Sequence, residues 1–301
     1  SVTDTNDGGF ALAGQTDEGS GTNDFWLIKL SGTNTNVIGE VGTVTLGANS
    51  GTWQEVSLEN SYTDPVVLVS PVSYEGVQPS TVRVKDVSSS SFNVRVREWG
   101  YLDGWHLAET LHYLVVESGT HTLPDGTVVE AGTVSTNHRW STFSYSGTFS
   151  SPPVVLTEVQ TRKGYQAVVP RQRNVGSSSF DVRVQESEGS DGWHFEEEIG
   201  YVAIEEASGT NNGMAYEAWT TANAVTHQWA TIGFSRDYGS SPVWIGNMQT
   251  SNGYQPAALR YESLTGTGVD VFAEEETSAD SETWHLDEQV GYMVFEADGD
   301  I

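Results

Sequence analysis

One motif occurs three times in this chain and constrains its fold more than any other feature. It reads W-H-x-x-E-x-x-x-Y-x-x-x-E and begins at Trp105, Trp193 and Trp284, so it recurs after 88 and then 91 residues. A unit that recurs at a nearly fixed spacing indicates a repeated structural element. The chain is therefore predicted to contain three tandem domains of one design.

Alternation within the motif predicts β-strands. In the first copy Trp105, Leu107, Glu109, Leu111 and Tyr113 occupy every second position, and alternate side chains of a strand share one face. Each such row is apolar except for a single glutamate, and a carboxylate buried alone costs several kcal/mol unless it is paired. We therefore expect three structural buried carboxylates, namely Glu109, Glu197 and Glu288.

The rest of the chain fits an all-β class, because no long stretch shows an apolar period of 3.6 residues and glycine is abundant at 32 residues. We expect an N-terminal β-hairpin followed by three tandem antiparallel β-sandwich repeats. The predicted boundaries are 1–40 for the hairpin and 41–119, 132–209 and 220–301 for the sandwiches. The linkers are short, so the three sandwiches are expected to pack closely around a pseudo-threefold axis.

Charge narrows the class of partners. Acidic residues outnumber basic ones by 41 to 13, the net charge is −28, and only three lysines are present. Such a surface repels nucleic acid and anionic membranes, and no apolar run reaches the roughly 18 residues of a membrane helix. This balance favours an extracellular or cell-surface protein of a halophile, with no nucleic-acid partner and no membrane insertion.

The first 40 residues differ from the rest. The segments 7–14 and 24–30 are expected to be two strands, and they resemble a D-G-G-[YF]-x-L-x-G … D-x-W-L-[VI]-K repeat of propeller-like surface proteins from halophilic prokaryotes. Only half of a four-stranded blade is present, so the hairpin must pack on its own chain, on an upstream propeller or on a neighbouring subunit. The loop Asp4-Thr5-Asn6-Asp7 could bind a structural Ca²⁺, although a solvated turn is the simpler interpretation.

Several offsets inside each repeat resemble the H-type lectin domain of snail agglutinins and discoidins. The matching features are an early Trp, a P-V-V-L strand at Pro65 and Pro153, an Arg nine residues before a residue that opens a strand, a Trp-His pair, and a last strand that ends in Glu. The resemblance implies trimer-like packing and recognition of galactose or N-acetylgalactosamine. It also implies the following carbohydrate-binding residues: Arg83, Trp105 and His106; Arg171, Trp193 and His194; Arg260, Trp284 and His285.

A scaffold role is the alternative for the same residues. A sugar site needs an aromatic face and polar partners for hydroxyl groups, which Trp, His and Arg supply. Equally, the tryptophans could belong to the core, and the arginines could pair inside the protein with the three buried glutamates. A metal site at His106 and Glu109 is not expected, because no paired histidine spacing supports it.

The predicted function is glycan binding and adhesion without catalysis. The sequence contains no G-x-S-x-G motif, no phosphate-binding loop and no cysteine, so no common catalytic arrangement is spelled out. The alternative is a structural subunit of an extracellular fibre or surface layer that assembles itself through residues 7–30 by donating a strand to a neighbour.

Overall fold

The computed structural model describes residues 37–48, 51–69, 71–240 and 242–301 in full, and the backbone of the strands within residues 2–30. Two compact units are present, residues 1–37 and 38–301, and each is described by itself. The first unit is an antiparallel sheet in the order β1-β2-β3, formed by β1 (Val2–Asp4), β2 (Phe10–Asp17) and β3 (Asn23–Leu30). The expected two-stranded hairpin is thus present with a short third strand.

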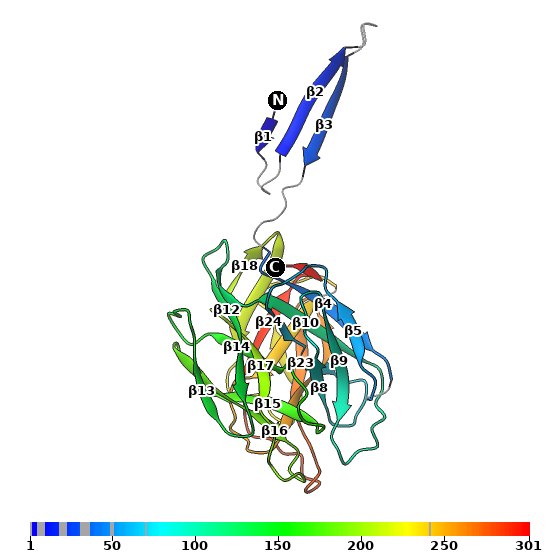
Figure 1. Cartoon of the computed structure of the whole chain (residues 1–301), viewed down its shortest axis with the longest axis vertical. Coiled ribbons are helices and arrows are strands. Elements are labelled where there is room, and N and C mark those ends of the chain that lie inside the picture. The colour runs from blue at the N-terminus through cyan, green and yellow to red at the C-terminus, as the bar shows by residue number, and fades with distance from the viewer. Residues whose placement is uncertain are drawn as a thin grey trace. The chain divides into compact units, whose positions relative to one another are not determined.

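Three sandwiches form the second unit, and all of its described regular elements are strands, which confirms the all-β class (Figure 1). The first contains β4 (Gly39–Leu46), β5 (Gln54–Ser57), β6 (Pro65–Leu68), β7 (Val72–Ser73), β8 (Ser80–Lys85), β9 (Ser91–Glu98) and β10 (Glu109–Glu117). The second contains β12 (Val128–Thr136), β13 (Ser141–Ser144), β14 (Val154–Val159), β15 (Val168–Arg173), β16 (Ser179–Glu186) and β17 (Glu197–Ile204). The third contains β19 (Met214–Thr220), β20 (Ala230–Gly233), β21 (Val243–Met248), β22 (Ala257–Thr265), β23 (Gly268–Glu275) and β24 (Val290–Phe295).

Each sandwich pairs a central sheet with a peripheral sheet. The central sheets have the strand orders β4-β10-β6, β12-β17-β14 and β19-β24-β21. Two peripheral sheets have the orders β5-β9-β8 and β13-β16-β15, and the third, β20-β23-β22, is continuous through β7 with the first central sheet. Side chains between the two sheets form one apolar core per sandwich. A fourth core unites residues from all three central sheets. The repeats therefore share an interior and are not three separate beads.

The P-V-V-L run shows why the central strands are so apolar. Val66 and Leu68 of β6 face the shared central core, whereas Val67 faces the core of its own sandwich, and all three are at most 1% exposed. Successive side chains of a strand point to opposite faces, so a strand buried on both faces must be continuously apolar.

Three short strands connect the repeats into a closed ring. β11 (Gly119–Thr122) follows the first sandwich and pairs with β12, and β18 (Ala207–Asn211) follows the second and pairs with β19. β25 (Gly299–Asp300) follows the third sandwich and pairs with β4 of the first. The Ile301 carbonyl also accepts a hydrogen bond of 2.7 Å from the Ile38 amide. The cyclic order of these contacts agrees with packing around a pseudo-threefold axis.

The repeats begin earlier than the sequence boundaries. Their first strands start at Gly39, Val128 and Met214, and the expected linker 120–131 is instead largely a hairpin of β11 and β12. Its turn is closed by a hydrogen bond of 2.9 Å from the Gly126 amide to the Leu123 carbonyl, with Gly126 at a φ of 93°. The Pro-Asp-Gly-Thr sequence therefore forms a tight turn between strands, and the segment joins the sheet of the second sandwich.

Candidate functional site

The Trp-His pairs lie in loops, which corrects the expectation that they begin strands. The strands that carry the motif start at Glu109, Glu197 and Val290, after the Trp-His pairs. In the first loop the Trp105 amide donates a 2.9 Å hydrogen bond to Oδ1 of Asp103, across Gly104 at a φ of 79°. The second loop repeats this turn at Asp191-Gly192-Trp193. The turn directs the tryptophan outward and the following histidine inward.

All three tryptophans of the motif are about half exposed, at 54% for Trp105, 49% for Trp193 and 56% for Trp284. A large apolar residue stands two positions later in each loop, namely Leu107, Phe195 and Leu286, and each is at least 40% exposed. In the second loop the rings of Trp193 and Phe195 lie 4.5 Å apart, edge to face. We call each Trp with its apolar neighbour an aromatic ledge; the chain presents three of them at equivalent positions.

The adjacent histidines are buried, each between two carboxylates. Nδ1 of His106, His194 and His285 lies 3.1, 2.6 and 2.5 Å from the carboxylates of Glu98, Glu186 and Glu275. Nε2 of the same histidines lies 2.9, 3.0 and 3.2 Å from Glu109, Glu197 and Glu288. A carboxylate oxygen accepts hydrogen bonds from an imidazole N–H, so each histidine links two glutamates. Burial lowers the pKa of His285, but its hydrogen bonds with Glu275 and Glu288 raise that pKa overall.

Hydrogen bonds and a nearby arginine lower the pKa of the glutamate that contacts Nε2 of each histidine. Burial by itself raises the pKa of Glu197, but hydrogen bonds from His194, the Thr161 hydroxyl and the Lys163 amide, with the charge of Arg83, lower it to about 2. The pKa values of Glu109 and Glu288 are lowered for corresponding reasons. The three carboxylates expected from the sequence to be buried are at most 1% exposed, as predicted.

The arginine that completes each network comes from the preceding repeat. Arg83 donates to Glu197 at 3.2 Å, Arg171 to Glu288 at 3.1 Å, and Arg260 to Glu109 at 3.2 Å. These arginines pair with these glutamates between repeats, from the first repeat to the second, from the second to the third, and from the third to the first. We call this set of contacts the charge ring.

A glycine makes room for each histidine. The G-x-Q turns of the three repeats begin at Gly76, Gly164 and Gly253, and a Cβ built on Gly76 would lie 2.8 Å from Nε2 of His106. The amide of Gly76 donates at 2.8 Å to Glu109, and the carbonyl accepts at 3.0 Å from Arg260. The turn is thus held by the charge ring, which explains why the sequence repeats a glycine there.

The structure separates the residues that the lectin resemblance grouped together. The arginines and histidines are at most 1% exposed and have internal partners, so they do not meet a ligand at the surface in this geometry. The tryptophans do. The sequence interpretation assigned no role to Glu98, Glu186 and Glu275; their position at the ends of repeated strands, eight to ten residues before a histidine, was the available signal.

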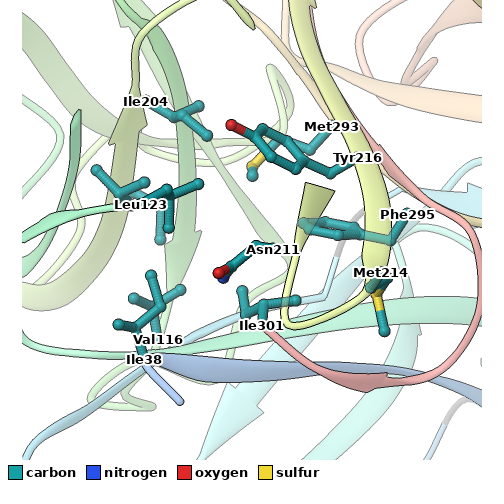
Figure 2. A pocket seen from close by; sticks show the side chains of 12 residues that line it. Ile38, Val116, Leu123, Ile204, Asn211, Met214, Tyr216, Met293, Phe295 and Ile301 are labelled. Atoms are coloured by element: carbon teal, nitrogen blue, oxygen red, sulfur yellow. The ribbon is translucent and has the colours of Figure 1, made fainter. Parts of the chain in front are cut away.

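Other sites are few in the part of the chain that the structure describes. There, no group of three His, Asp or Glu side chains is arranged to hold a metal ion, and no helix could cross a membrane. Residues 5–7 of the candidate calcium loop lie outside the described residues. A cavity of about 20 Å³ at the central core is lined by Leu123, Tyr216, Phe295 and the buried amide of Asn211 (Figure 2). It has room for about one water molecule and for no larger ligand.

Comparison with known proteins gives one informative relative. The chain is similar to halomucin of Haloquadratum walsbyi, with 34% identity over 258 residues. This match covers 81% of the chain but only 3% of halomucin, so the chain spans a small fraction of that protein's length. No protein-family model matches the chain, and no solved structure matches it.

Proposed function

We propose that this chain is a non-catalytic module for glycan binding and adhesion in an extracellular or surface protein of a halophilic prokaryote, built as three H-type-lectin-like sandwiches. The similarity to halomucin and the net charge of −28 with three lysines support the halophilic surface setting. The extended acidic surface suits high salt, where self-repulsion is screened within about 3 Å at 1 M.

The aromatic ledges are the observation that carries glycan binding. A half-exposed indole offers a flat apolar face for the C–H side of a pyranose, and its edge remains open to polar partners. The ring centres of His138 and Trp193 lie 6.3 Å apart in the second repeat, and those of His227 and Trp284 lie 6.3 Å apart in the third. Three ledges on one rigid ring would bind a polyvalent surface with avidity even if each contact were weak.

The charge ring supports the same function indirectly. It holds the loop that carries each tryptophan in place, because the buried histidine next to the tryptophan contacts two glutamates, as His106 contacts Glu98 and Glu109. A ligand-binding aromatic residue on a fixed loop loses less conformational freedom on binding. The arginines and histidines are therefore positioning residues in this proposal, and the tryptophans contact the glycan.

A glycan array in high salt tests the proposal. The triple variant Trp105→Ala, Trp193→Ala and Trp284→Ala is expected to lose binding while retaining its circular dichroism spectrum, since these side chains are half exposed. Trp229→Ala, which removes a 42% exposed tryptophan outside the ledges, is the matched control and should bind normally. A blank array with correctly folded protein, or equal loss in the control, would refute glycan binding by the ledges.

Strand donation remains the second proposal. In the N-terminal unit β3 pairs with β2 through eight residues and has no second neighbour among the described strands. An unpaired strand edge can accept a strand from another chain. Deletion of residues 1–35 should then abolish filaments seen by electron microscopy; filaments that persist after the deletion would exclude this route of assembly.

A further inference from the structure

Basic side chains are scarce in this protein, yet several gather where the first repeat meets the second. The Arg95 guanidinium lies 4.4 Å from the centre of the Trp53 ring, and the Arg162 guanidinium, from the second repeat, lies 6.0 Å from the same ring. Arg162 also lies 4.9 Å from the ring of Tyr165. Arg97 is two residues beyond Arg95 on β9, and so on the same face of the strand.

These arginines have no anionic partner in the described structure. The ion pairs formed by described residues include none with Arg95, Arg97 or Arg162, although acidic residues outnumber basic ones threefold. Arg95 is 6% exposed, and its Nε has no hydrogen-bond partner; Nε of Arg97 has none either. Burial, and then the positive charges of Arg97, Arg162 and Arg83, lower the pKa of Arg95 to about 10.

The other two repeat contacts show that packing does not require this charge. Strand pairing sets Arg95 opposite Arg83, Arg183 opposite Arg171, and Phe272 opposite Arg260, so these three positions are equivalent. Two residues further along the strands are Arg97, Gln185 and Glu274. The hydroxyls of Ser73, Thr161 and Thr250 each donate to a glutamate of the charge ring, so these three positions are also equivalent. The residues that follow them are Tyr74, Arg162 and Ser251.

Counted over these three positions, the contact between repeats 1 and 2 carries three positive charges, from Arg95, Arg97 and Arg162. The contact between repeats 2 and 3 carries one, from Arg183, and the contact between repeats 3 and 1 carries one negative charge, from Glu274. Equivalent positions at the three contacts between repeats thus differ in charge, although the strands that carry them correspond. A cluster of guanidinium groups without carboxylates is costly unless an anion neutralises it.

We propose that the surface formed by Arg97, Arg162 and Tyr165, next to Trp53 and the buried guanidinium of Arg95, binds an anionic sugar, a pyranose that bears a carboxylate or a sulfate group. Guanidinium groups pair with such oxyanions through two parallel hydrogen bonds. Tyr165, which is 79% exposed, supplies an aromatic face for the ring of the sugar. High salt screens the repulsion between the ligand and the acidic remainder of the protein, whereas direct contacts persist.

This inference rests on the proposed glycan binding but uses different residues, so the two can fail separately. Calorimetric titrations of the full chain with glucuronic acid and galactose 6-sulfate should show binding, and galactose should show none at this surface. Arg162→Gln should weaken binding of both acidic sugars about tenfold or more, the loss of one charge-assisted hydrogen bond. Arg162 is exposed, so the variant should melt at the temperature of the parent protein.

Arg183→Gln is the control, because it removes the one arginine counted at the contact between repeats 2 and 3, and it should leave acidic-sugar binding unchanged. Equal weakening in this control, or acidic sugars that bind no better than galactose, would overturn the proposal. Inorganic sulfate binding as tightly as galactose 6-sulfate would overturn the sugar part of it. Arg162→Gln should not alter binding at the aromatic ledges, so an array result that refutes the ledges leaves this experiment decisive on its own.

Discussion

Breaking one link of the charge ring tests whether it holds the three repeats together. Arg171→Met keeps much of the length of the side chain and removes its charge. In the structure the Arg171 guanidinium donates to Glu288 at 3.1 Å, to the Gly253 carbonyl at 3.2 Å and to the Gln255 carbonyl at 2.8 Å. Arg171 is 1% exposed and Glu288 is not exposed at all. The substitution therefore removes the arginine charge from a buried carboxylate, which keeps its contacts with His285, the Thr250 hydroxyl and the Asn252 amide, and it removes a donor from two carbonyl groups.

The expected loss of stability is large. Removing one partner of a buried ion pair costs about 3 to 5 kcal/mol, because the remaining charge stays buried and has lost its counter-charge from the arginine. For a unit of this size, 1 kcal/mol corresponds to about 2 to 4 °C in melting temperature. The variant should accordingly melt about 6 to 20 °C below the parent protein in a calorimetric scan at constant salt.

Arg173→Met provides the control on the same strand. Arg173 pairs with Asp181 at 3.3 Å, but its side chain is 41% exposed, and exposed ion pairs contribute about 1 kcal/mol or less. The double variant Arg171→Met with Glu288→Gln should regain part of the loss, because no buried charge is left unpaired. If Arg171→Met and Arg173→Met had the same melting temperature, the charge ring would not stabilise the packing of the three repeats.

Three further outcomes follow from the same contacts. Glu197 has a folded-state pKa of about 2 against an ordinary 4.5, so its stabilisation is complete above pH 4.5 and lost as pH falls toward 2; acid titration of unfolding should show this, and Glu197→Gln should flatten the curve. The pKa of His285 is raised, because bonds to Glu275 and Glu288 outweigh burial, so its stabilisation is complete below pH 6.5 and lost at higher pH; urea unfolding across pH 6 to 9 should show a decline that His285→Gln lacks. Gly164→Ala should destabilise by several kcal/mol because its Cβ would overlap the ring of His194, whereas Gly176→Ala, with its nearest neighbour at 3.6 Å, should be close to neutral in the same melting assay.

The sequence by itself determined the repeat, the strand class and the chemistry of the interior. Apolar runs such as Pro65–Leu68 predicted strands, because a strand that is buried on both faces must be apolar at every position. A single glutamate in an apolar row predicted a buried carboxylate with a partner. Local periodicity failed at the Trp-His pairs. Alternation placed Trp105 inward with Glu109, whereas the turn at Gly104 breaks the alternation and exposes the tryptophan.

Only the tertiary structure decided which repeat supplies each arginine. Arg83, Arg171 and Arg260 occupy the same position in identical patterns, so each could have paired within its own repeat as far as the sequence shows. The choice depends on how three sandwiches meet around a shared core, where Arg83 reaches Glu197 of the next repeat. Spacing along a chain encodes local geometry, whereas contacts between folded units are set by their packing.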